Sequence, residues 1–501
     1  MKKNVAIIGG GIAGLNAGVE LLQHGYDVSL YEKNEEVGGL CSGYFVDGYN
    51  VDCCLHWLMG TKKRTIIGEL WRNNDALNDD VEISHLPYFC TFNYQGTIVT
   101  LSRNLDEEEA RWLVLAPEDK KQIISFFECV RSLAAVWSLT QNKKSQRFTM
   151  DLIKTLPNSI KLLSAMKSSR KAYSKKFTNP ALRFAVKNGM TGYNNAFFFM
   201  LVYGLFSSGD GDVPLGGAYY MVQRIKNKFL SLGGKLFLNS EIEKLNVEDG
   251  EVISASYGNN KIEADYFISA FDTSFTLNKL LDGKYKLKAL ETMNKNITSN
   301  SISSSFCVYI KVDSYQHNIE TPTCVSIDKT KVGKHRRSSL LIRPYDFDTT
   351  FNYGDSAVIS LFIDQDEDDY WFFKEIKNYE EEYNRIVKDM LNWFIKFYPE
   401  YDGKYTILTS FGPLELEKRT NTSYGALQSF SFTDKGKMYM FNGKIKQIDN
   451  LYFCGQWNRS IGGTPTALLT SHDIVEKILK RDKENIAQKL LHSIRNNKAK
   501  A

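Results

Sequence analysis

A glycine-rich turn near the N-terminus has the spacing of a dinucleotide-binding site. The apolar run Val5 to Ile8 is suited to a buried strand, and Gly9-Gly10-Gly11-Ile12-Ala13-Gly14 follows it directly. Glycines in the first, third and sixth positions allow a tight turn, close approach of a pyrophosphate, and close packing of the next helix on the strand. The phosphate charge then lies at a helix N-terminus, where backbone N–H groups bind anions. The pattern predicts that this turn holds a dinucleotide.

An acidic residue follows at the distance expected for a ribose contact. Gly25 is placed to end the helix, Val28 to Tyr31 has the composition of a second strand, and Glu32 comes at its end. A carboxylate there binds a ribose hydroxyl and repels a 2′-phosphate. The spacing therefore favours FAD or NAD over NADP, and a glycine-rich turn without any nucleotide is the alternative.

Other kinds of catalytic site are not indicated. The eight cysteines form no C-x-x-C pair, and the seven histidines are scattered without an H-E-x-x-H motif. We expect no metal site, no disulfide framework and no Ser-His-Asp set, so a bound cofactor must supply the chemistry. The cysteine usage favours a reducing compartment, and we expect a cytoplasmic protein.

The elements that position these residues require a large folded chain. The sequence has 501 residues, of which 43% are hydrophobic and 24% charged. This is an ordinary globular composition with room for two or three domains, and it excludes a small module, a disordered chain and a fibrous protein.

Positive charge is concentrated in one segment. Residues 143–187 contain twelve Lys and Arg residues and the single acidic residue Asp151, whereas the net charge of the whole chain is only +5. A basic helical segment of this kind is attracted to anionic lipid, which predicts a peripheral contact with the inner face of the membrane. A solvated helical face explains the charge equally well. No nucleic-acid-binding signature accompanies it, so we expect no nucleic acid partner.

One strongly apolar stretch, 196–206, is too short to cross a bilayer, since a spanning helix needs about 20 residues. We expect a core helix there, or a wall of a tunnel for a hydrophobic substrate. Residues 383–397 have the helical spacing of a core-facing helix that ends before Pro399, and the acidic run Asp364 to Asp369 before it is expected to be a solvated loop.

Three further motifs resemble those of the FAD-dependent amine oxidase and phytoene desaturase superfamily. Gly38-Gly39-Leu40-Cys41 leads to a turn that contains Asp52, and Pro214-Leu215-Gly216-Gly217 comes in the middle of the chain. The third runs from Leu451-Tyr452-Phe453-Cys454-Gly455-Gln456-Trp457 to Gly462-Gly463-Thr464-Pro465-Thr466-Ala467-Leu468-Leu469. The sequence is most similar to the branch of phytoene desaturases, carotenoid isomerases and retinol saturases.

The resemblance implies an α/β fold of the GR2-type flavoproteins. A Rossmann-like FAD-binding domain would be assembled from discontinuous segments, with an inserted α+β substrate-binding domain and a helical, basic lobe. We expect the FAD-binding domain at 1–60, 213–275 and 438–479, the substrate-binding domain at 61–212 and 276–437 with the basic lobe at 143–187, and a basic C-terminal tail at 480–501.

The resemblance also assigns a noncovalent FAD to particular residues. The pyrophosphate would lie at Gly9, Gly11 and Gly14, the adenosine ribose at Glu32 and the adenine at the backbone of Ile242. The ribitol and isoalloxazine would lie near Gly455, Gln456, Thr464, Pro465 and Ala467. The other expected cofactor contacts are Ile12, Ala13, Lys33, Gly38, Gly39, Leu40 and Gly463. The chain departs from the family at Leu40, where a basic residue is common, and at Gln456, where an acidic residue is common. The 462–464 segment has no cysteine for a thioether link. No catalytic residue is assigned, but His56 is the first candidate for a polar contact, with a structural histidine as the alternative.

The function implied is an FAD-dependent oxidoreductase that transfers hydride between flavin and a hydrophobic polyene or lipid, as in bacterial carotenoid or lipid metabolism. Desaturation is the first expectation. A redox-neutral isomerase that uses reduced FAD, which the Gln456 variant favours, and a double-bond saturase are alternatives. A noncatalytic lipid-binding flavoprotein is the alternative from a different class. The sequence leaves the substrate, the electron acceptor and the oligomeric state open.

Overall fold

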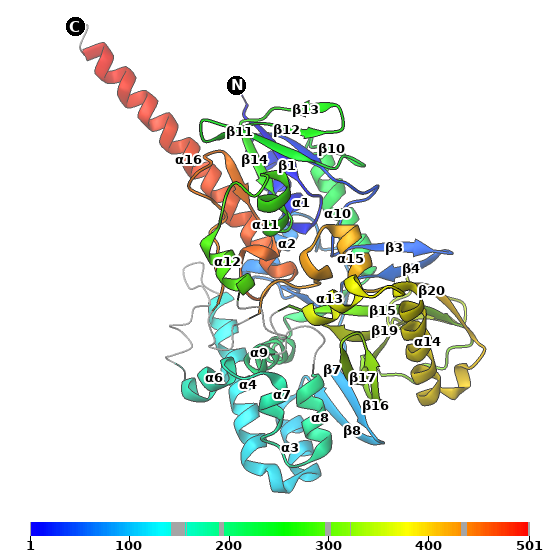
Figure 1. Cartoon of the computed structure of the whole chain (residues 1–501). Coiled ribbons are helices and arrows are strands. Elements are labelled where there is room, and N and C mark those ends of the chain that lie inside the picture. The colour runs from blue at the N-terminus through cyan, green and yellow to red at the C-terminus, as the bar shows by residue number, and fades with distance from the viewer. Residues whose placement is uncertain are drawn as a thin grey trace.

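The computed structural model describes residues 2–141, 156, 158–189, 195–295, 302–320, 322–431 and 438–498. Within this part of the chain, two large sheets and a helical lobe are packed together (Figure 1). The confirmed fold class is mixed α/β with a Rossmann-like domain.

A five-stranded parallel sheet forms the Rossmann-like part, in the order β10, β2, β1, β14, β21. Its strands are β1 (Asn4–Ile8), β2 (Asp27–Tyr31), β10 (Lys235–Phe237), β14 (Tyr266–Ser269) and β21 (Leu451–Phe453). They come from the beginning, middle and end of the chain and lie inside the three segments expected for an FAD-binding domain. The boundaries of that domain stay a prediction.

The continuous apolar run of β1 follows from burial on both faces of this sheet. Val5 and Ile7 belong to the core beneath the helices, whereas Ala6 and Ile8 belong to a second core on the opposite face. Ile7 is fully buried, which is worth about 1.5–3 kcal/mol for a side chain of this size.

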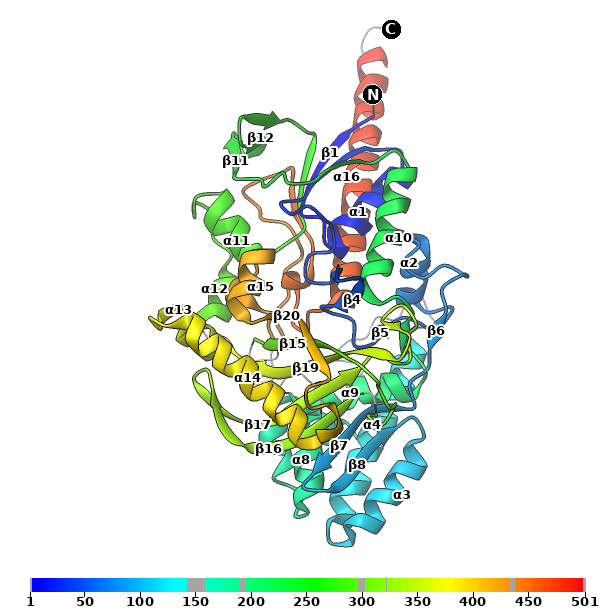
Figure 2. The same cartoon turned by 90° about the vertical axis from the view of Figure 1, so that its right-hand side faces the viewer.

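Helices cover one face of the sheet and a small meander covers the other. The helices are α1 (Ile12–Gln23), α10 (Gly217–Ser231) and α16 (Thr464–Lys498), and α1 packs against both of the others. The opposite face carries β11 (Lys244–Glu248), β12 (Glu251–Tyr257), β13 (Asn260–Ile262), α11 (Thr273–Phe275) and α12 (Lys288–Lys295). The predicted tail continues α16, which extends beyond the body of the molecule in both views (Figures 1 and 2).

The second sheet has eight strands and is mainly antiparallel, with one parallel pair between β7 and β16. Its strands are β7 (Tyr88–Tyr94), β8 (Thr97–Ser102), β15 (Ser304–Val312), β16 (Thr323–Val332), β17 (His335–Pro344), β18 (Asn352–Tyr353), β19 (Ser356–Gln365) and β20 (Tyr405–Phe411). One face packs on α14 (Tyr379–Phe397), the predicted core-facing helix (Figure 2). The other face, with Cys307, Tyr309 and Phe362, joins the large core that reaches the Rossmann-like sheet.

The helical lobe lies beyond the eight-stranded sheet (Figure 1). It contains α3 (Leu105–Leu115), α4 (Lys120–Gln141), α6 (Ser159–Met166), α7 (Arg170–Ser174), α8 (Pro180–Asn188) and α9 (Ala196–Ser207). Side chains of α9 from Ala196 to Phe206 are all buried, so the apolar stretch is a core helix. No helix in the described ranges is long and apolar enough to span a membrane. Residues 143–155 and 157 of the predicted basic segment lie outside the described residues.

The acidic run was predicted incorrectly as a solvated loop. Asp364 belongs to β19, and Asp366 caps α13 (Glu367–Glu375) through a reciprocal bond with Asp369. Asp369 is fully buried and also pairs with Arg337. Burial raises the pKa of Asp369 to about 6, and the neighbouring guanidinium opposes that rise. Consecutive acidic residues satisfied by capping and one ion pair need not face solvent.

Shorter elements connect these layers. They are β3 (Gly43–Val46), β4 (Tyr49–Asp52), β5 (Leu58–Met59), α2 (Ile66–Asn73), β6 (Ile83–Ser84), β9 (Gly211–Pro214) and α15 (Pro413–Thr420). The antiparallel pair of β3 and β4 and the C-terminal end of α15 both reach the functional site described next.

Candidate functional site

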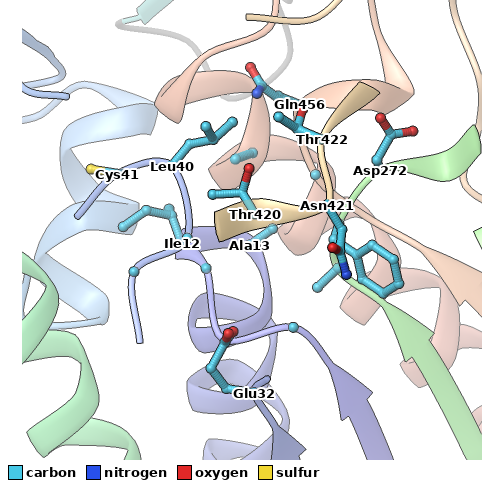
Figure 3. Close-up of a pocket in the computed structure, with 18 of the residues that line it drawn as sticks. Ile12, Ala13, Glu32, Leu40, Cys41, Asp272, Thr420, Asn421, Thr422 and Gln456 are labelled. Atoms are coloured by element: carbon cyan, nitrogen blue, oxygen red, sulfur yellow. The ribbon is translucent and has the colours of Figure 1, made fainter. Parts of the chain in front are cut away.

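A cavity with an empty volume of about 1070 Å³, which includes open solvent at its mouth, lies at the carboxyl ends of the parallel strands β1, β2 and β14. Every residue predicted to contact the cofactor lines it except Gly14 and Pro465. In Figure 3, Glu32 lies at one end of the cavity and Gln456 at the opposite end. The structure thus brings together predicted residues from distant parts of the sequence.

The glycine turn has the geometry that its spacing requires. Gly9 adopts a φ of +103°, and a Cβ on Gly14 would come within 2.0 Å of the Gly9 carbonyl oxygen. A Cβ on Gly11 would meet no atom closer than 3.8 Å, because that side of Gly11 faces the cavity. No side chain caps the N-terminus of α1 at Gly11. The free N–H groups of the first helical turn are therefore available to an anionic ligand.

Glu32 is held at one end of the cavity by three hydrogen bonds. Its Oε2 accepts from the Gly10 N–H at 2.7 Å, and its Oε1 accepts from the backbone N–H and the side-chain amide of Asn34 at 3.0 and 2.8 Å. The side chain is buried. Because each carboxylate oxygen offers more than one acceptor site, the carboxylate can still accept from ribose hydroxyls.

The C-terminal end of α15 closes the cavity beside this carboxylate. Lys33 Nζ donates to the Lys418 carbonyl and to Asn421 Oδ1, both at 2.7 Å. The Asn34 amide donates to the Arg419 carbonyl at 3.1 Å. Burial lowers the pKa of Lys33. Lys33 was predicted as a cofactor contact and lines the cavity, but the hydrogen bonds of its amine join the end of β2 to the end of α15.

Arg419 is the most informative residue that sequence reasoning missed. It lines the cavity, and its Nη1 donates to Cys53 Sγ at 3.4 Å beside the ring of Phe411. Its Nε and Nη2 are shielded from solvent and have no hydrogen-bond partner among the described residues. Leaving such donors unpaired costs about 1–3 kcal/mol or more, which indicates an acceptor on a ligand. The sequence signal was an arginine in the last turn of a helix, which is common without a ligand.

The opposite end of the cavity is built around Gln456. Its Oε1 accepts from the Gly463 N–H at 2.7 Å, and its Nε2 donates to the Leu427 carbonyl at 3.2 Å. The Gly455 N–H donates to Thr470 Oγ1 on α16 at 2.9 Å. The Gln456 amide therefore joins the segments that form the cavity wall. Pro465 lies in the first turn of α16, whose N-terminal end faces the cavity through Thr464 and Ala467.

His56 does not line the cavity. Its ring packs against Phe362 at 4.9 Å between centroids. Burial and the nearby Arg343 guanidinium lower the pKa of His56 to about 3, so the imidazole is neutral at physiological pH. The preceding Asp52 accepts from the backbone N–H groups of Cys54, Leu55 and Ala218 and thereby fixes the turn. A catalytic role for His56 stays a prediction.

Further residues without a sequence prediction complete the lining. They include Asn34, Cys41, Cys54, Ser240, Glu241, Asp272, Phe275, Thr420, Asn421, Thr422 and Trp457. Most lie in loops next to predicted motifs, but Thr420 to Thr422 come from the 276–437 range, which was predicted to bind substrate and has no motif that indicates a cofactor.

Comparisons with known proteins agree with this architecture. A family model described as an NAD(P)-binding Rossmann-like domain matches residues 7–73. The 4,4'-diaponeurosporene oxygenase of Staphylococcus aureus is 23% identical over 524 residues, which cover 97% of this chain and 100% of that protein. An oxidoreductase from Methanosarcina mazei has a TM-score of 0.58 at 13% identity and covers 94% of this chain and 100% of its own. A putrescine oxidase bound to putrescine has a TM-score of 0.58 at 12% identity, with 96% and 99% covered.

The match to the oxygenase spans both sheets and the helical lobe, whereas the Rossmann-like family model covers only the first part of the chain. The likeness to the solved oxidases establishes the shared fold. The chain is therefore similar over nearly its whole length to the 4,4'-diaponeurosporene oxygenases and shares the fold of the solved putrescine oxidase, in agreement with the resemblance stated from its sequence.

Proposed function

We propose that the protein is an FAD-dependent oxidoreductase of the phytoene desaturase-like family that transfers hydride between flavin and a hydrophobic polyene. The proposal rests on the observation that the glycine turn, Glu32 and the Gln456 segment line the same cavity. The full-length relationship to 4,4'-diaponeurosporene oxygenase supports a carotenoid-like substrate.

The residues present fit a noncovalent FAD. The uncapped N-terminus of α1 would hold the pyrophosphate, Glu32 the adenosine ribose, and the wall at Ile242 the adenine. The N-terminal end of α16 would face the flavin ring and favour negative charge there. Bound FAD supplies hydride acceptance or donation, and the protein supplies orientation and exclusion of water.

Arg419 provides the positive charge that Leu40 does not. Two unpaired guanidinium donors inside the cavity match the acceptors of a phosphate or of a flavin carbonyl. We propose that Arg419, from α15, replaces the basic residue that relatives often have after the second glycine of the early pair.

We assign the FAD-binding domain to 1–60, 213–275 and 438–479 and the substrate-binding domain to 61–212 and 276–437. The sheet face that carries Cys307, Tyr309 and Phe362 is buried in the large core, and it also carries the polar side chains of Ser360 and Arg343. The basic lobe at 143–187 would hold the protein against the anionic inner face of the membrane, from which a hydrophobic substrate is delivered.

The test is an anaerobic titration of the FAD-loaded, oxidised protein with 4,4'-diaponeurosporene in detergent micelles, with a saturated hydrocarbon of similar length as the control. We expect the visible flavin absorbance to fall in proportion to the polyene converted. If the absorbance is unchanged, the same polyene with reduced flavin distinguishes an isomerase or a saturase by its product. Bound FAD without turnover in either state would favour the noncatalytic lipid-binding alternative.

A further inference from the structure

Two cysteines face each other across the short hairpin that reaches the cavity. In the antiparallel pair of β3 and β4, Gly43 lies opposite Asp52. The Cys53 N–H donates to the Ser42 carbonyl at 3.0 Å, which continues the pairing by one position. Cys41 and Cys54 lie just outside this pairing, one on each side of the hairpin, and their thiol groups interact with each other.

This pair lies in the wall of the proposed FAD cavity. Both Cys41 and Cys54 line it, and Figure 3 shows Cys41 beside Leu40 at its edge. Both thiols are free. Both thiols therefore lie in one cavity wall and interact, which places them where a disulfide between them can be tested.

The two thiols differ in their surroundings. The hydrogen bond with Cys54 and burial raise the pKa of Cys41 well above its usual range. Cys41 is buried, and Cys54 is the more accessible of the two. The third cysteine near the hairpin, Cys53, has a different partner, because its Sγ accepts a hydrogen bond from Arg419.

We propose that Cys41 and Cys54 form a redox-active dithiol that exchanges an electron pair with the bound flavin. The inference rests on the proposed FAD site. In the forward step both S–H bonds break, one S–S bond forms between the two sulfurs, and two electrons and two protons pass to oxidised flavin. The reverse step returns them and restores both thiols. The direction at equilibrium depends on the two reduction potentials.

The first experiment tests the pair in the apoprotein. The full-length protein is treated with the thiol oxidant diamide, alkylated, digested without reduction and analysed by mass spectrometry. We expect a cross-linked peptide that contains Cys41 and Cys54, with the mass of two hydrogen atoms lost, and a loss of two titratable thiols per chain. The Cys41→Ser and Cys54→Ser variants should each lose the cross-link. Cys129→Ser, which changes a buried thiol on α4 away from the cavity, should keep it.

The second experiment tests electron exchange in both directions without oxygen. Dithiol protein is mixed with oxidised FAD, and disulfide protein is mixed with reduced FAD, while visible absorbance and free thiols are recorded. We expect flavin and thiols to change together in at least one direction in the wild type and in Cys129→Ser, and in neither direction in Cys41→Ser. Cys41→Ala and a thermal melt serve to separate loss of the thiol from loss of folding.

The outcomes separate this inference from the proposed function. FAD that binds normally while flavin and thiols stay unchanged in both directions overturns the dithiol and leaves the FAD site standing. A missing cross-link in the oxidised apoprotein also overturns the dithiol alone. A folded protein that does not bind FAD overturns both.

Discussion

At the scale of single residues, two glycines of the same turn should respond differently to substitution. A Cβ on Gly14 collides with the Gly9 carbonyl, whereas a Cβ on Gly11 enters the cavity. We therefore expect Gly14→Ala to destabilise the protein, because the helix and strand can no longer pack closely. We expect Gly11→Ala to fold normally and lose FAD.

Thermal melts of the two apoproteins and FAD titrations followed by flavin fluorescence check this contrast. Gly25→Ala, at a turn with no atom within 4 Å of the added Cβ but a φ of +84°, serves as a control for backbone strain alone. Normal FAD affinity in Gly11→Ala would contradict the assignment of the pyrophosphate to this turn.

For Arg419 we expect a substitution to change the stability of the apoprotein and the affinity for FAD in opposite directions. Replacing it with leucine removes unpaired buried donors, so the apoprotein should become more stable by about 1 kcal/mol. FAD binding should weaken by about 1.5–3 kcal/mol, the usual range for hydrogen bonds to a charged group, which is about 10-fold to 150-fold in Kd.

Denaturation of the apoprotein and FAD titration of Arg419→Leu measure the two effects. Lys418→Met, which changes the exposed neighbour, should alter neither. If Arg419→Leu lowers stability and leaves the affinity for FAD unchanged, the guanidinium has a structural role only.

At the residue scale, a prediction from the sequence is most specific where one local pattern contains the whole signal. Gly9, Gly11 and Glu32 belong to a strand, turn, helix and strand that follow one another in the chain, and the structure places all three in the cavity wall. Arg419 could not be found in this way, because nothing near it in the sequence indicates that α15 ends against the Asn34 loop. Gln456 was found by resemblance, but its bonds to Leu427 and Gly463 became visible only in the structure.

At the scale of elements, a histidine links α16 to α1. His472 Nδ1 lies 2.7 Å from Glu20 Oε2, and the other oxygen of Glu20 accepts from Asn16. The hydrogen bond with Glu20 raises the pKa of His472 above its usual 6.5, Glu476 and Asp473 act in the same direction, and burial opposes the rise. Stability from this pair is fully present below pH 6.5 and is lost as the pH rises through the folded-state pKa.

We expect the stability difference between the wild type and His472→Gln to be largest near pH 6 and to shrink towards pH 9. Chemical denaturation at several pH values measures it, and Glu20→Gln should remove the same dependence. A difference that stays constant or grows with pH would show that the charged imidazole does not stabilise this contact.

A helix or strand could be predicted from the sequence when its own residues contained the pattern. The helix at 383–397 and the core helix at 196–206 follow from periodicity and composition, and both are present. The prediction of a solvated loop for the acidic run was wrong because charge alone indicates that a residue faces solvent. In the structure, Asp369 forms an ion pair with Arg337 and a hydrogen bond in the cap of α13. A pairing between residues of different elements is not encoded in the local pattern of either.

At the scale of the whole molecule, the FAD site should not survive in a fragment. Residues 1–141 contain the glycine turn and Glu32, and they include the range that matches the Rossmann-like family model. They lack β10 and β14, which flank β2 and β1 in the sheet, and β21, which pairs with β14. Without these strands, the apolar faces and edges of β1 and β2 are exposed.

We expect the 1–141 fragment to be unfolded by circular dichroism and to retain no FAD after gel filtration. The intact chain under the same conditions provides the comparison. A folded fragment that keeps FAD would mean that the site needs only its N-terminal part.

The order of the strands also has a consequence for biosynthesis. A ribosome releases β1 and β2 first, β10 and β14 near the middle of translation, and β21 only when residues 451–453 emerge. Until then, one edge of β14 has no partner, and unpaired edges favour aggregation of nascent chains. Chaperone demand should therefore peak late in translation, and the cofactor should be acquired after the chain has left the ribosome.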